Sequence, residues 1–198
     1  AKYIDAQYPE RPLMPQDPKT RGLCLMMEEC ADESIGTKSR KALFSAISKD
    51  QYFRKSLLPN SAPDVLKTLI EGVPGDVLKV LGVGVGYSPD AVQDAMRDLK
   101  QDLEALTLIL ESSPYLLGDE PCLADFAVAG LSLLLKFPGD DYLDLPETVK
   151  GKGVPGLADN PIYQPFFDWR DRLYVQFRKP IIGSTINSPG APTSIQID

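Results

Sequence analysis

The pattern of apolar and polar positions is clearest between residues 89 and 112. Apolar side chains recur there at steps of three and four residues, and charged or amide side chains fill the positions between them. This spacing puts the apolar set on one face of an α-helix. We expect a long amphipathic helix that opens at Ser88-Pro89 and buries Val92, Met96, Leu99, Leu103, Leu106 and Leu110.

A second helical segment, residues 124–136, has almost no polar face. A helix that is apolar all round must be covered on all sides. Its small residues, among them Ala127, Ala129 and Gly130, would let neighbouring helices approach closely. We therefore expect a fully buried helix in this segment.

Weaker helical patterns fill much of the remaining chain. Asp17-Pro18 supplies an N-cap and a first-turn proline, which predicts a helix from Pro18 to about Ile35. Residues 39–58 also read as helical. Residues 62–81 should form two short helices, because Pro74-Gly75 interrupts their apolar series.

A last helix should follow Asn160-Pro161 and stop before Pro180. Its buried face is predicted to carry Phe166, Trp169 or Arg170, Leu173 and Phe177. Its basic residues could suggest a nucleic-acid surface, but the acidic chain favours a solvated basic side made of Arg170, Arg172, Arg178 and Lys179.

No run of alternating residues predicts a strand, so the sequence predicts an all-α fold. We divide the chain into three parts. Residues 1–16 are the end of a helix and a proline-rich linker, residues 17–180 are the helical domain, and residues 181–198 are an extended tail.

Composition excludes several classes of function. The formal net charge of −7 argues against nucleic acid or an anionic membrane as a partner, and no apolar run is long enough to cross a bilayer. The chain has no histidine, which removes Ser-His-Asp and Cys-His nucleophiles and histidine-based metal sites. Three cysteines without a CxxC pair predict neither a disulfide framework nor a metal site, and favour a reducing compartment. We expect the cytoplasm, or the plastid stroma if the source is eukaryotic.

The stretch from Tyr115 to Phe126, YLLGDEPCLADF, has the features of a loop that ends in a helix cap. Cys122 stands at the N-cap position and Asp125 three residues later, where its carboxylate can accept the backbone N–H of residue 122. A thiol is a weak acceptor, so we expect the Asp125 half of this capping box to carry the cap.

This stretch resembles the glutathione-transferase family, whose C-terminal domain carries a loop of the form YLxGDxPTLAD before its central helix. Cys122 departs from the Ser or Thr usual at the cap. Residues 1–18 resemble the end of that family's thioredoxin-like domain and its linker. The fold implied is the all-α, C-terminal-like helical bundle of a glutathione transferase, as in cyanobacterial and plastid members.

The resemblance also implies a function. Glutathione would be held by a thioredoxin-like domain that this sequence does not contain, so no catalytic residue is expected in the chain. The first helix would line the pocket for a small electrophilic substrate and form the interface of a homodimer. The residues expected at the substrate are Leu23, Met26, Met27, Cys30 and Met96.

Other interpretations remain open beside this one. The domain could be a non-catalytic protein-interaction module, with contacts through residues 138–160 and the C-terminal tail. Gly82–Gly86 lacks the spacing and the preceding strand of a dinucleotide-binding loop, so we interpret it as a loop between helices. The apolar neighbours of Cys24 and Cys30 indicate ordinary packing rather than reactive thiols.

Overall fold

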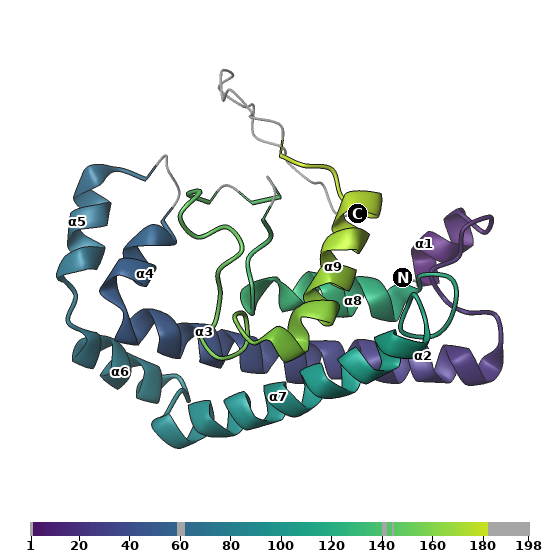
Figure 1. Ribbon diagram of the computed structural model, residues 1–198, viewed down its shortest axis with the longest axis horizontal. Helices are drawn as coiled ribbons and strands as arrows, with labels where there is room; N and C mark the ends of the chain where they lie inside the picture. The colour runs from purple at the N-terminus through teal and green to yellow at the C-terminus, as the bar shows by residue number, and fades with distance from the viewer. Residues whose placement is uncertain (1, 59–61, 140–141, 144, 182–198) are drawn as a thin grey trace, which may run out of the picture.

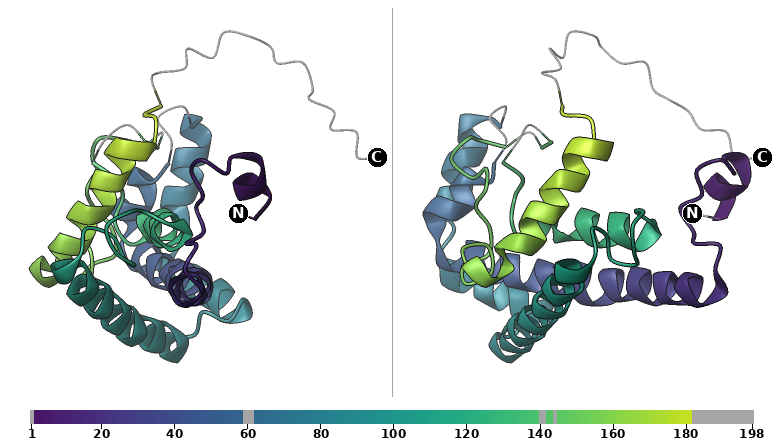
Figure 2. Two further views of the ribbon diagram at one scale, coloured as in Figure 1. Left: turned by 90° about the vertical axis from the view of Figure 1, so that its right-hand side faces the viewer. Right: turned by 45° about the vertical axis from the view of Figure 1, so that its right-hand side comes forward.

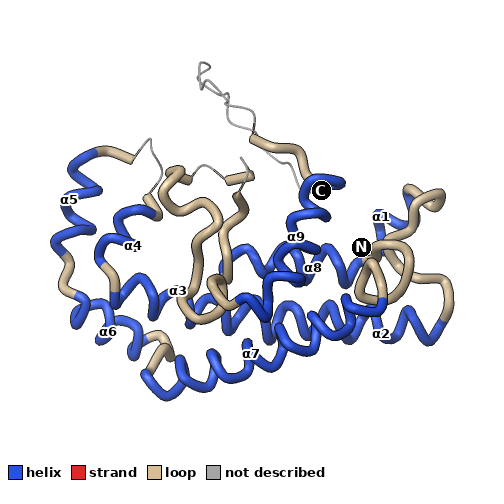
Figure 3. Tube along the Cα trace, in the orientation of Figure 1, coloured by secondary structure: helices blue, strands red, loops and turns tan. Residues whose placement is uncertain are grey.

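The computed structural model describes residues 2–58, 62–139, 142–143 and 145–181. All regular structure in these residues is helical (Figure 3), apart from two isolated bridges, so the all-α prediction is confirmed. In chain order the elements are α1 (Lys2–Gln7), α2 (Pro18–Cys30), the π-helical η1 (Ala31–Gly36), α3 (Thr37–Lys49), α4 (Gln51–Ser56), α5 (Asp64–Gly72), α6 (Gly75–Gly84), α7 (Pro89–Ser112), α8 (Leu123–Leu131), the short η2 (Ser132–Leu134) and η3 (Pro161–Tyr163), and α9 (Gln164–Phe177).

The long helix α7 begins and ends as predicted, but of the six residues expected to be buried, Val92, Met96 and Leu110 are only half-buried. Ser88 caps it by accepting the backbone N–H of Ala91 at 3.2 Å. Leu99, Leu103 and Leu106 are buried, as the apolar stripe requires. Figure 1 shows α7 running beside a long rod made of α2, η1 and α3. Helix α8 also packs on this rod, and α9 packs against α7 and α8.

The rod itself corrects the sequence prediction, which ended the first helix near Ile35 and began another near Ser39. The chain instead stays helical from Pro18 to Lys49, because η1 widens to π-helical turns without a break. At this point the rod lies against α8. A Cβ added to Gly36 would lie 3.1 Å from a methyl carbon of Leu131. Close packing against α8 therefore favours continuity where the local pattern suggested an end.

The start of the first helix and the break at Pro74-Gly75 are confirmed. Asp17 accepts the backbone N–H of Thr20 at 2.8 Å, and Pro18 occupies the first turn. Helices α5 and α6 lie on either side of the break. The loop predicted at Gly82–Gly86 is wrong in part, because α6 continues through Gly84. Residues 39–58, predicted as one weak helix, are split at Asp50 between α3 and α4.

The prediction of a fully buried helix at 124–136 is wrong in part. Helix α8 ends at Leu131, and a single 3-10 turn follows it. Its buried face carries Ala124, Asp125, Val128 and Ala129, which pack towards α2 and η1. Phe126, Ala127 and Gly130 are only half-buried, because α9 covers the opposite side incompletely.

Helix α9 also differs from its prediction at two positions. Arg170 belongs to the core, not to the solvated basic side: it is fully buried, stacks on Phe167 and Tyr174, and donates to the carbonyl oxygen of Lys136. Phe177 is 55% exposed although it was expected to be buried, because α9 ends there. Phe166, Trp169 and Leu173 are buried as expected.

Helices α5 and α6 form the outer end of the molecule (Figures 1 and 2). Neither buries its apolar residues, and α5 has no buried residue at all. The exposed apolar side chains of this pair are those of Val65, Leu66, Leu69, Val77, Val80, Leu81 and Val83. At the far end of the chain, the extended tail predicted for 181–198 lies outside the described residues except for Ile181.

Candidate functional site

The loop before α8 is organised around the carboxylate of Asp125, which is fully buried. One of its oxygens, Oδ2, accepts the backbone N–H of Cys122 at 2.9 Å, so the predicted carboxylate half of the cap is present. The other, Oδ1, accepts the backbone N–H of Leu116 at 2.8 Å. One side chain thus fixes both the helix start and the far side of the loop.

The N-terminal linker is docked on the same loop. Leu13 accepts the backbone N–H of Leu123 at 2.9 Å. Asp5 of α1 accepts the N–H groups of Leu13 and Met14 at 2.8 and 2.9 Å, and Met14 is buried. Sequence reasoning missed Asp5 because its partners lie eight and nine residues away, outside any local capping pattern.

Cys122 is a packed thiol in this cap. Its Sγ lies 3.2 Å from Asp125 Oδ2, to which it donates, and 3.6 Å from the Sγ of the buried Cys24. Burial, followed by the negative charge of Asp125, raises the pKa of Cys122 to about 12. The thiolate that a reactive cysteine needs is therefore disfavoured at this helix start.

A small cavity of about 140 Å³ lies between the rod, α7 and α8. The π-helical segment η1 forms part of its wall, and π-helical turns are frequent at functional sites. The walls are almost entirely apolar and consist of Met27, Cys30, Ala31, Ile35, Asp102, Ala105, Leu106, Ile109 and Val128.

The structure brings together two of the five residues predicted at the substrate. Met27 and Cys30 line the cavity. Leu23 and Met26 are not among its lining residues and are 42% and 70% exposed, while Met96 packs half-buried against the core. The helical pattern missed the cavity residues of α7 and α8, because a pattern within one helix does not show which neighbour it faces.

One side of the cavity carries a polar cluster. Asp102 accepts the hydroxyl of Ser34, and Lys38 donates to the same hydroxyl at 2.7 Å and pairs with Asp98 at 3.1 Å. Cys30 is exposed, contrary to the packing expected for it. Desolvation, and then the charge of Asp102, raises the pKa of its thiol, so less of Cys30 is in the thiolate form at neutral pH.

Within the described residues, no group of His, Cys, Asp and Glu side chains could hold a metal ion. In that same part of the chain, no helix has the length and apolar character needed to cross a membrane. Comparison of the chain with protein-family models, curated proteins and solved structures finds no match.

Proposed function

We propose that this chain is the C-terminal-like helical domain of a glutathione-transferase-type protein, and that it supplies the pocket for the electrophilic substrate. The proposal rests on the apolar cavity beside the first long helix, which is lined by Met27 and Cys30. Its support comes from the Asp125 cap, which fixes the loop on which the family resemblance rests.

The size and chemistry of the cavity limit what it would hold. At about 140 Å³ it is close to the size of apolar protein cavities that bind benzene. Its walls offer few hydrogen-bonding groups, so a tripeptide such as glutathione does not fit it. The cavity would take the ring or chain of a small electrophile, and glutathione would be held and activated by a thioredoxin-like domain.

The exposed surface of α1 and the residue after it suggests where such a domain would lie. Tyr3 of α1 is 77% exposed, Ile4 is half exposed, and Tyr8, just after the helix, is 61% exposed. Asp5 anchors α1 through the linker backbone. A thioredoxin-like domain packed on α1 would cover these apolar side chains, which are costly to leave in water as a group.

The finer expectations belong to the same proposal. A homodimer would use the outer face of α2, where Leu25 and Met26 are exposed at 41% and 70%. The three free thiols suit a reducing compartment such as the cytoplasm. Sedimentation of the wild-type protein and a Met26→Glu variant tests the dimer: the variant should shift towards monomer.

The enzymatic proposal is tested on the intact gene product, with 1-chloro-2,4-dinitrobenzene as the electrophile. Ile109→Trp should fill the cavity and raise KM for the electrophile several-fold, while KM for glutathione stays unchanged. Leu108→Trp is the matched control, because Leu108 is 59% exposed on the same helix and does not line the cavity.

Two results would contradict the proposal: an upstream gene sequence without a thioredoxin-like segment, or an intact protein that does not bind glutathione. We also expect the 198-residue chain alone to have no glutathione-saturable turnover. In the event of either contradiction, the interaction-module alternative is favoured by the exposed apolar side chains of α5 and α6. A partner protein that binds the wild-type chain but not the Leu69→Glu variant would support that module.

A further inference from the structure

A second and larger cavity lies at the other end of the molecule, where α6 crosses α3. Two glycines of α6 permit this close approach. A Cβ added to Gly75 would lie 2.7 Å from the carbonyl oxygen of Ser48, and one added to Gly82 would lie 2.5 Å from the ring of Phe44. The glycines therefore fix α6 directly against α3, and the start of α7 closes the remaining side.

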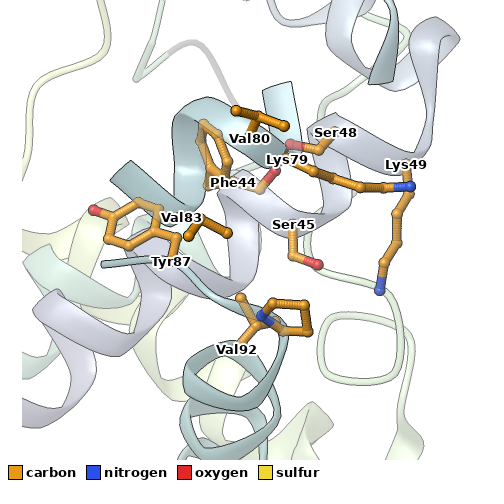
Figure 4. Close-up of a pocket in the computed structure, with 10 residues that line it drawn as sticks. Phe44, Ser45, Ser48, Lys49, Lys79, Val80, Val83, Tyr87 and Val92 are labelled. Atoms are coloured by element: carbon orange, nitrogen blue, oxygen red, sulfur yellow. Dashed lines mark hydrogen bonds between the residues drawn. The ribbon is translucent and has the colours of Figure 1, made fainter. Parts of the chain in front are cut away.

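The cavity between these three elements has a volume of about 280 Å³ (Figure 4). That is near the lower end of the range for small-molecule sites. The lining residues come from α3, α6, the loop after α6 and the start of α7. They are Phe44, Ser45, Ser48, Lys49, Lys79, Val80, Val83, Tyr87, Pro89 and Val92.

The lining of this pocket is mostly apolar, and two of its side chains are joined by ring packing. The rings of Phe44 and Tyr87 meet edge to face, with centroids 5.3 Å apart. Val80 and Val83 are 72% and 53% exposed although they line the pocket. An apolar group bound between them would remove this surface from water, which is favourable.

The charge at the mouth of the pocket is positive. Figure 4 shows the side chains of Lys49 and Lys79 along one side of the pocket, with Tyr87 on the opposite side. Lys79 pairs with the exposed Asp76 at 2.9 Å, an exposed contact of little strength. Among the residues that the structure describes, no carboxylate pairs with Lys49, and none lines the pocket.

We propose that this pocket binds a small amphipathic carboxylate, with its apolar chain against Phe44, Val80 and Val83 and its carboxylate at Lys49. The local positive charge is notable because the whole chain carries a net charge of −7. An apolar pocket with an uncompensated ammonium group at its mouth selects for an anion with an apolar body. The site is separate from the cavity lined by Met27 and stands independently of the transferase proposal.

The test titrates the purified chain, without glutathione, with decanoate, decan-1-ol, decylammonium and butyrate in a calorimeter. Decanoate should bind at one site, decan-1-ol at least tenfold more weakly and decylammonium more weakly still. Butyrate should not bind, because it lacks the apolar chain. Equal affinity for the three ten-carbon ligands, or no binding of decanoate at millimolar concentration, would overturn the proposal.

Variants place the ligand in the pocket. Lys49→Gln should weaken decanoate binding about tenfold and leave decan-1-ol unchanged, while Lys19→Gln at the far end of the rod should change neither. Val80→Asp puts a carboxylate into the pocket and should abolish decanoate binding. Val77→Asp, on an exposed residue of the same helix outside the lining, should have no effect.

The opposite results are equally informative. Decanoate binding that survives both Lys49→Gln and Val80→Asp would refute this site. Loss of binding in Ile109→Trp would move the ligand to the cavity on the first helix and refute the proposal as well. Circular dichroism of each variant establishes that a loss of binding is not a loss of folding; Val80 and Lys49 are exposed, so both variants should keep the wild-type helix content.

Discussion

Replacing Asp125 by Ala should be the most damaging single substitution at the helix cap. The change removes the acceptor of two backbone N–H groups, those of Cys122 and Leu116, at a site with no exposure to water. A buried donor left without a partner costs about 1–3 kcal/mol. Two such donors, together with the lost charge at the helix N-terminus, should lower the free energy of unfolding by roughly 3–5 kcal/mol.

The matched control is Asp17→Ala. Asp17 also caps a helix, accepting the N–H of Thr20 at 2.8 Å, but it does so on the surface, where water can replace it. Its loss should cost about 1 kcal/mol. Urea unfolding followed by circular dichroism measures both variants, and the difference between them isolates burial and the second hydrogen bond to Leu116.

Since small domains are stable by only about 5–15 kcal/mol, Asp125→Ala could abolish folding. Asp125→Asn covers that case, because it keeps one acceptor oxygen and should cost about half as much as the Ala variant. The reasoning is refuted if Asp125→Ala is no more destabilising than Asp17→Ala, or if Asp125→Asn is as stable as the wild type. Either result would mean that the loop does not depend on this carboxylate.

Three further predictions concern the thiols and the α3–α6 contact. The pKa of Cys122 is raised from about 9 to about 12 in the folded state, so the unfolded thiol ionises first and stability should fall as pH rises from 9 to 12. The free energy of unfolding should fall by up to about 1.4 kcal/mol per pH unit. The Cys122→Ser variant should lack this contribution, which is measured by urea unfolding of both proteins at pH 8 and 10.5. An aromatic disulfide reagent at pH 8 should react with the exposed Cys30 in the native protein, but with Cys24 and Cys122 only after unfolding. Rapid reaction of all three thiols in the native protein would contradict the burial of Cys24 and Cys122. Gly75→Ala should destabilise the protein by about 1–3 kcal/mol, because its Cβ would meet the α3 backbone, whereas Gly84→Ala, with open space around it, should be neutral or slightly stabilising in thermal unfolding.

Local sequence patterns were enough to predict much of the helical architecture. The three- and four-residue spacing of Leu99, Leu103 and Leu106 was enough to place α7 and its buried face. Proline and capping residues marked the starts at Asp17 and Ser88, because an N-cap bonds within its own first turn. For the same reason the hydrogen bond from the backbone N–H of Cys122 to the Asp125 carboxylate was predictable from a spacing of three residues.

Local sequence patterns could not predict the contacts between segments that are distant in the chain. The helical spacing left Arg170 open between the buried face and the basic side, and its burial is decided by the rings of Phe167 and Tyr174 and by the carbonyl oxygen of Lys136 on another segment. Of the predicted substrate residues, Met27 faces the cavity and Met26 faces outward, a choice set by where α7 and α8 pack on the rod.

Hydrogen bonds and periodicities within a few residues were enough to predict that the chain folds into helices, where most of them begin, and which carboxylate caps α8. Only the packing of the whole chain shows that α2 and α3 form one rod, that Asp125 also accepts the backbone N–H of Leu116, and that the cavity lined by Met27 lies apart from the one lined by Phe44. Each of these depends on the approach of segments far apart in the chain, which is governed by packing rather than by local spacing.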